Sequence, residues 1–354
     1  MKLMSKSYVL RHKEAEEMNV KRWVALIVAG VLLLFSLGIN TIFALFKADF
    51  LGNFDSLMAG NNLDVYENVI EGDNFDKRIA YLKVDGTIQD IGSSSLWQPV
   101  AYDHQFFLEQ LDSILYDDTI EGIVLSVNSP GGGVKESAEI YKKLLKIKEE
   151  RQIPIYVSMD SMAASGGYYI SAPADKIFAH RDTITGSIGV IMQSINYQAL
   201  AEKVGVKFET FKSGEHKDML SPMRDVTPEE RAMMQDMINE TYEEFVDIVE
   251  QGRNMSEADV KKVADGRILG GTKALEAGLV DEIGDEEAAI AALRADFGLE
   301  DAVLFEYAYD MGGWQSYVGM KIGSMFGPSA EEKMLMKIMT DYNAPKMMYL
   351  YGEY

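Results

Sequence analysis

Residues 160–169, DSMAASGGYY, decide how the rest of this chain is interpreted. They follow a short apolar run at 153–157 and precede a helix-like stretch, a pattern that predicts a strand turning sharply into a helix. Ser165 lies in the turn among alanines and glycines that are too small to cover its hydroxyl. Such a turn more often serves close packing, but it also presents a nucleophile, so the stretch alone leaves both interpretations open.

The composition excludes several classes of function. The chain has 354 residues, 47% of them hydrophobic, which is enough for one large or two modest domains with a core. Its net charge of −22 would repel a phosphate backbone, so we expect no nucleic-acid partner. The absence of cysteine excludes disulfides, thiolate catalysis and cysteine–metal sites.

An uncharged apolar stretch at residues 23–46 predicts a transmembrane anchor. At a rise of about 1.5 Å per residue it is long enough to cross a hydrocarbon core about 30 Å thick. It is longer than the roughly 7–15 apolar residues of a cleaved signal peptide, the main alternative. Basic residues crowd the preceding segment, 1–22, so the positive-inside rule predicts a single-pass protein of the cell membrane. Its N-terminus would be cytoplasmic and its folded part extracytoplasmic.

The rest of the chain is interpreted as a linker, one domain and an extension. Residues 47–77 are rich in Gly, Asn and Asp and are typical of a stalk. Within 78–300, strand-like and helix-like segments alternate, which predicts an α/β domain with a largely parallel sheet. One of the predicted strands is 207–211. The pattern fades in 301–354, whose aromatic end favours a role in assembly or in covering a groove.

A second glycine-rich turn precedes the serine. Residues 128–133, NSPGGG, follow a buried-strand pattern at 122–127. A serine nucleophile needs backbone N–H groups aimed at the position where the oxyanion forms. The N–H groups of Gly132 and Gly166 are the candidates, because no side chain would block an approaching carbonyl oxygen. An ordinary glycine turn is the alternative.

The serine hydroxyl also needs a base within about 3 Å. The candidates are His180, His216, Lys212 and Lys217. A lysine can serve only when it is neutral, so its pKa, ordinarily about 10.4, must be lowered by burial. The residues alone do not select one of the four.

Five motifs, in order along the chain, resemble signal peptide peptidases of the SppA type. They are NSPGGG at 128–133, MAASGGYY at 162–169, TGSIGV at 185–190, KSGEHKDMLSP at 212–222 and ADGRILGGTKALEAGLVD at 264–281. The likeness covers about residues 78–292 and is to the short, single-domain bacterial form.

The resemblance implies a ClpP/crotonase-like domain with repeated ββα units and a Ser–Lys dyad. Ser165 matches the family's nucleophile, and Lys217 matches its general base. Gly132 matches the N–H donor of the oxyanion hole, with Gly166 directly after the serine. Ser187 matches a position that would orient the lysine amine.

The resemblance further implies a membrane-anchored serine endopeptidase that cleaves remnant signal peptides and other short hydrophobic peptides through an acyl-enzyme. We expect peptide substrates, contact with the membrane, a homo-oligomeric ring, and no cofactor or metal. Two other classes of function are less consistent with the sequence. A crotonase-like acyl-CoA enzyme is disfavoured by the anchor and the net charge of −22. A non-catalytic scaffold is disfavoured because Ser165 and Lys217 are both present.

Overall fold

The computed structural model describes residues 65–91, 102–309 and 346–352. The predicted anchor at 23–46 lies outside these ranges. Within them, no helix is long and apolar enough to cross a membrane. From Tyr66 onward the chain forms one compact unit, and the description below concerns that unit.

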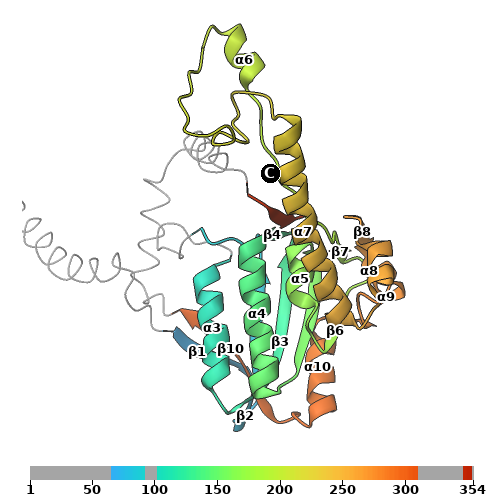
Figure 1. The fold of residues 1–354 in the computed structure, drawn as a ribbon. Helices are drawn as coiled ribbons and strands as arrows, with labels where there is room; N and C mark the ends of the chain where they lie inside the picture. The colour runs from blue at the N-terminus through green and yellow to red at the C-terminus, as the bar shows by residue number, and fades with distance from the viewer. Residues whose placement is uncertain (1–64, 92–101, 310–345, 353–354) are drawn as a thin grey trace, which may run out of the picture. The chain divides into compact units, whose positions relative to one another are not determined.

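The unit is a mixed α/β fold built on a large, mostly parallel sheet (Figure 1). The order in the sheet is β1-β10-β2-β3-β5-β6-β9, with β7 paired to β5 and β8 to β7. The strands are β1 (Val65–Glu71), β2 (Asn74–Asp85), β3 (Ile120–Ser129), β5 (Ile155–Ala164), β6 (Lys176–Ala179), β7 (Ile184–Gly186), β8 (Ile268–Gly270), β9 (Glu282–Ile283) and β10 (Ala302–Tyr309). The short strands β4 (Gly131–Gly133) and β11 (Met348–Leu350) form a separate pair. This architecture confirms the predicted α/β class and the largely parallel sheet.

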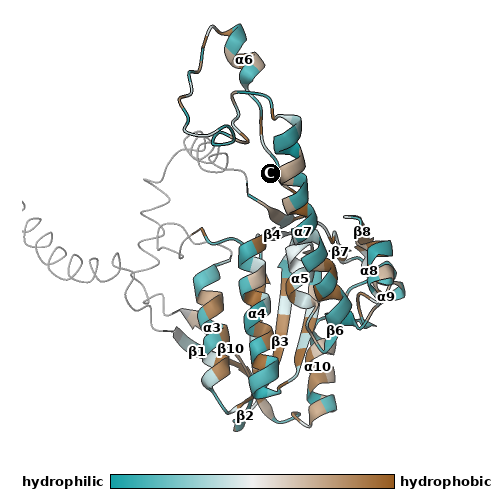
Figure 2. Ribbon diagram, in the orientation of Figure 1, coloured by the Kyte–Doolittle hydropathy of each residue, from teal (hydrophilic) through white to brown (hydrophobic). Residues whose placement is uncertain are grey.

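Helices cover both faces of the sheet. They are α3 (His104–Tyr116), α4 (Val134–Arg151), α5 (Gly166–Ser171), α6 (Gln198–Lys203), α7 (Pro228–Arg253), α8 (Glu257–Val263), α9 (Gly271–Glu276) and α10 (Glu286–Phe297). Side chains of α3, α4, α5 and α7 share one core with the sheet, and α10 packs in a second core. Figure 2 shows hydrophobic residues concentrated in the central strands and mostly hydrophilic residues along the visible side of α7.

The central strands are apolar on both faces, which is why they appear as continuous hydrophobic runs in the sequence. Because side chains alternate along a strand, Leu82 and Leu125 face the core beneath α3 and α4. Their neighbours Tyr81 and Val124 face the core beneath α10. All four are nearly or completely buried. The carboxyl ends of β3 and β5 therefore meet at one edge of the sheet, where both glycine-rich turns lie.

Three segments differ from what the sequence pattern indicated. β1 and the start of β2 fall within 47–77, the stretch interpreted as a stalk, and β10 falls within the extension. β10 pairs in parallel with β2, a long-range contact that local periodicity cannot reveal. The predicted strand at 207–211 is wrong: residues 204–227 form no helix or strand. Its apolar side chains Phe208 and Phe211 are exposed, and no described strand pairs with residues 207–211.

Truncating the centre of the sheet should destabilise the whole domain. Leu125 in β3 is completely buried, so Leu125→Ala should lower the free energy of unfolding by about 2–5 kcal/mol, measured by urea denaturation. Tyr116→Ala is the matched control, because Tyr116 is 80% exposed and its loss should cost less than about 0.5 kcal/mol. Equal midpoints for the two variants would contradict this account of the core.

Candidate functional site

Ser165 occupies a strained turn between β5 and α5. It is the single residue between Ala164 and Gly166, and its backbone has φ 55° and ψ −115°. For a residue with a side chain this conformation costs on the order of 1–3 kcal/mol. Two hydrogen bonds hold it: the Ser165 N–H donates to the Gly186 carbonyl at 2.8 Å, and the Ser165 carbonyl accepts from the Tyr169 N–H at 2.9 Å. The sharp strand-to-helix turn predicted here is present.

The small residues after Ser165 are required by close contacts. A Cβ on Gly166 would stand 2.7 Å from the Oγ of Ser137, and a Cβ on Gly167 would stand 2.8 Å from the carbonyl oxygen of Ser129. Neither position can take a side chain without a shift of its neighbours. The sequence did not single out Ser137, whose hydroxyl is completely buried and has no hydrogen-bond partner among the described residues.

The glycine turn at 128–133 lies directly against the Ser165 turn. A Cβ on Gly166 would stand only 3.0 Å from the backbone nitrogen of Gly132. Gly166 is the first residue of α5, so its own N–H has no acceptor within that helix. The N-terminus of the 18-residue helix α4 follows Gly133 and adds partial positive charge here. The two N–H groups predicted as oxyanion donors therefore lie close to each other beside Ser165.

Ser187 lies one residue beyond the carbonyl that holds Ser165 in place. Its backbone has φ 49°, and its N–H donates to the carbonyl of Arg267 at 2.7 Å. The residue is nearly buried. Its position next to Gly186 keeps it near the Ser165 turn.

The four candidate bases differ in what their side chains contact. His180 is exposed. The Lys212 amine donates to a backbone carbonyl at 2.6 Å and to Asp218 at 2.7 Å. The Nδ1 of His216 is buried without a hydrogen-bond partner among the described residues. Lys217 is exposed, and its amine makes no hydrogen bond or ion pair with any described residue.

Within one chain, Ser165 and Lys217 make no hydrogen bond with each other. Ser165 lies at the end of a core strand and is 1% exposed. Lys217 belongs to the irregular segment 204–227, which together with α6 extends past the N-terminal end of α7 in Figure 1. No hydrogen bond links the two side chains in the described part of the chain.

A strand from the C-terminal segment lies against the glycine turn. The sequence indicates only a role in assembly or in covering a groove for this segment. β11 runs antiparallel to β4, with Tyr349 opposite Gly132. On the other side of β11, Met348 and Ile191 exchange two backbone hydrogen bonds of 2.9 and 3.0 Å. The C-terminal strand is therefore held between β4 and Ile191, as an added strand would be.

The carbonyl oxygen of Tyr349 faces both glycine turns. A Cβ on Gly131 would stand 2.0 Å from that oxygen and 2.5 Å from the backbone nitrogen of Gly166. The Tyr349 ring is completely buried, with its centroid 4.7 Å from that of Tyr169 and 4.8 Å from that of Phe245. This burial raises the pKa of Tyr349. An extended chain thus fits here with its backbone at the glycines and an aromatic side chain among aromatic neighbours.

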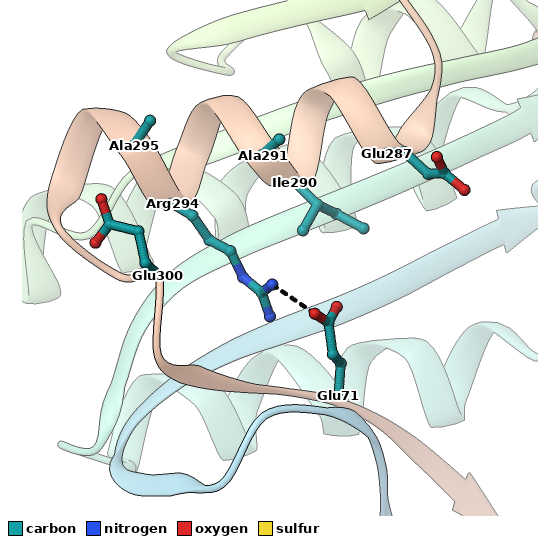
Figure 3. Close-up of a pocket in the computed structure, with 7 residues that line it drawn as sticks. All are labelled: Glu71, Glu287, Ile290, Ala291, Arg294, Ala295 and Glu300. Carbon is teal, nitrogen blue, oxygen red and sulfur yellow. Dashed lines mark hydrogen bonds and ion pairs between the residues drawn. The ribbon is translucent and has the colours of Figure 1, made fainter.

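A hollow on the α10 face of the sheet is separate from this region (Figure 3). Arg294 crosses it, and its Nη1 lies 3.0 Å from Glu71. Glu287 and Glu300 add further carboxylates to its wall. Within the ranges that the structure describes, no cluster of three or more His, Asp or Glu is placed to hold a metal ion.

Comparison with known proteins identifies the family. Residues 147–300 match the model of peptidase family S49. A protein of Enterococcus faecium that is named for signal peptide peptidase SppA is 43% identical over 344 residues, which cover 95% of this chain and 99% of that relative. The chain belongs to peptidase family S49.

More distant relatives agree with this assignment. Protease 4 of Haemophilus influenzae is 29% identical over 84% of this chain and 52% of its own length. The chloroplastic serine protease SPPA of Arabidopsis thaliana is 29% identical over 61% of this chain and 32% of its own length. This S49 chain is accordingly a serine peptidase, and the family resemblance drawn from the five motifs is confirmed.

A side chain at Gly166 should disable the site. The added methyl of Gly166→Ala would meet the Ser137 hydroxyl and the Gly132 nitrogen, so we expect peptide hydrolysis to fall by about 100-fold, as when an oxyanion donor is displaced. Gly270→Ala is the control, since its Cβ would meet no atom closer than 3.7 Å. Wild-type activity and melting temperature in Gly166→Ala would contradict the close packing described here.

Proposed function

We propose that this S49 peptidase is a membrane-anchored serine endopeptidase that hydrolyses remnant signal peptides and other short hydrophobic peptides. The observation that carries the proposal is Ser165, held at a positive φ beside two glycine N–H groups. The fold of the domain would be the ClpP/crotonase-like one that the family resemblance implies. The apolar stretch 23–46 would anchor it, with 1–22 in the cytoplasm and the catalytic domain outside.

The reaction is an acyl transfer through a Ser–Lys dyad. Neutral Lys217 accepts the proton of the Ser165 hydroxyl as its oxygen attacks the peptide carbonyl carbon. The N–H groups of Gly132 and Gly166 stabilise the oxyanion, each worth about 2.7–4 kcal/mol. The protonated lysine then gives its proton to the leaving amine, and an ester forms on the serine. Lys217, oriented by Ser187, activates water to hydrolyse that ester.

Lys217 is a better candidate base than its neighbours because its amine is uncommitted. The Lys212 amine already donates hydrogen bonds to Asp218 and to a backbone carbonyl. A lysine base must lose its charge, which requires burial. Lys217 is exposed in a single chain, so another surface must cover it in the active enzyme.

We place the two halves of the dyad in neighbouring copies of the chain. Among the described residues no lysine is hydrogen-bonded to the Ser165 side chain, and Lys217 lies in a region with many exposed apolar side chains. These include Leu200 in the preceding helix α6 and Val204, Phe208 and Phe211 in the loop itself, which are 60%, 67%, 54% and 92% exposed. Such side chains favour burial against another protein surface. A head-to-tail contact of this kind, repeated until it closes, produces a homo-oligomeric ring.

Substrates would bind as an extended strand in the place that β11 occupies. Main-chain hydrogen bonds to β4 and to Ile191 would supply affinity for any peptide, and the aromatic cluster around Tyr169 would favour an apolar or aromatic side chain. The C-terminal segment would then compete with substrates and limit hydrolysis. This gives residues 301–354 the groove-covering role.

A mixing experiment tests the dyad and its arrangement. Ser165→Ala and Lys217→Ala should each be folded and nearly inactive against a hydrophobic peptide. When the two variants are unfolded and refolded together in equal amounts, about a quarter of the interfaces combine an intact serine with an intact lysine. We therefore expect up to about a quarter of wild-type activity to return.

The outcomes separate the alternatives. No recovery in a mixture that assembles would contradict a dyad shared between copies. Full activity in Lys217→Ala alone would remove that lysine from the mechanism and return Lys212 and His216 to consideration.

Removing the C-terminal strand tests the groove-covering role. Deletion of residues 346–354 removes β11, so we expect KM for a hydrophobic peptide to fall several-fold while kcat stays near wild type. Tyr349→Ala, which removes one ring from the aromatic cluster, should give a smaller fall in KM. Unchanged KM in both variants would refute competition by the C-terminus.

A further inference from the structure

Residues 204–227 contain no helix or strand. Turn hydrogen bonds order the backbone around Lys217 locally, such as the one from the Lys217 N–H to the Gly214 carbonyl at 3.2 Å, and side-chain contacts tie this loop to α7. The guanidinium of Arg224 makes most of the side-chain contacts that join this loop to α7. Arg224 makes three hydrogen bonds to Asp218, the residue after Lys217. Its Nε donates to Oδ2 at 3.0 Å, and its Nη2 donates to Oδ1 at 2.8 Å and to the Asp218 carbonyl at 3.1 Å. Three bonds from one planar group leave the Asp218 backbone little freedom.

The other side of the same guanidinium is bound to the first turn of α7. Arg224 donates to both oxygens of Glu230, at 2.8 and 2.5 Å. The Glu230 side chain is 1% exposed, and it also closes the capping box of α7 by accepting the Thr227 N–H at 3.0 Å. Arg224 therefore ties an irregular loop to a 26-residue helix. Without it, Glu230 would be a buried carboxylate lacking its cation, which is strongly unfavourable.

The cluster is also balanced in charge. Arg224 and Lys212 supply two positive charges, and Asp218 and Glu230 supply two negative ones. Hydrogen bonds from Arg224 lower the pKa of Asp218 and lower that of Glu230 to about 2. Both carboxylates are thus ionised at neutral and alkaline pH.

Other titratable groups lie on the same two elements. The loop carries Glu215, His216 and Asp225, and the first turn of α7 carries Glu229. His216 Nδ1 lies 3.9 Å from Glu230 Oε1, beyond hydrogen-bond distance, whereas Arg224 donates hydrogen bonds to both Asp218 and Glu230. Loss of Arg224 would leave an extra negative charge beside Lys217, and a nearby negative charge favours a protonated amine. A general base must be unprotonated to act.

We propose that Arg224 is a positioning residue for the lysine base: it fastens the Lys217 loop to the N-terminus of α7 and balances the carboxylate charge of Asp218, the residue that follows Lys217. The inference rests on the proposed role of Lys217. Arg224 would then have two separable roles. Balancing the carboxylate charge depends on its positive charge, and fastening the loop depends on the several N–H donors of its planar guanidinium.

Three variants separate these tasks in the pH dependence of kcat/KM. Arg224→Gln removes the charge and the fork, so kcat should fall at least 10-fold with little change in KM, and the rising limb should move about one pH unit higher. Arg224→Lys keeps the charge, so its limb should stay at the wild-type pH while kcat falls. In Arg224→Gln combined with Asp218→Asn the charges balance again, so the limb should return although kcat remains low.

The controls separate a failure of this inference from a failure of the dyad. Arg294→Gln removes a guanidinium on the α10 face and should keep the wild-type profile. Melting temperature and oligomeric state are measured for every variant, and Arg224→Lys keeps the inference testable if Arg224→Gln does not fold. A wild-type limb in folded Arg224→Gln, with Lys217→Ala inactive, overturns the role of Arg224 alone. An active Lys217→Ala overturns the dyad itself.

Discussion

The hydrogen bond from the Ser165 N–H to the Gly186 carbonyl is the contact on which the candidate site depends. It joins the end of β5 to β7 and holds the serine backbone at a φ that residues with side chains seldom adopt. The cost of that conformation is offset by the packing of a sheet buried on both faces. The glycines that follow are required for the same reason, since atoms of Ser137 and Ser129 fill the space their side chains would need.

The same lack of side chains shapes how a peptide can approach. β4 is three glycines long and pairs through its backbone alone with a strand from the C-terminus. Under the proposed function, recognition at this edge would use main-chain groups that every peptide has, and selectivity would come from neighbouring side chains such as Tyr169 and Phe245. An enzyme for varied remnants of signal peptides needs this combination of general backbone binding and a preference for apolar side chains.

The sequence predicted the elements whose signals are local. Apolar runs marked the central strands, and the Ser165 turn followed from its small residues. The misses are long-range. β10 is recognisable only through its pairing with β2, and the pattern at 207–211 predicted a strand although no strand in the described part of the chain pairs with it. The Arg224 cluster was missed because its members are ordinary charged residues until the fold brings them together.

The proposed base Lys217 lies in a loop without helix or strand, yet a general base must be held at a fixed position beside the serine. Arg224 can fix the position of the loop, because it ties the loop to α7, a helix that packs in the core. A single chain does not bury the Lys217 amine, since Lys217 is exposed in it. If a neighbouring copy provides that burial, the base becomes competent only on assembly. An isolated subunit would then carry a well-formed serine turn with no neutral base beside it, so proteolysis would be confined to the assembled enzyme.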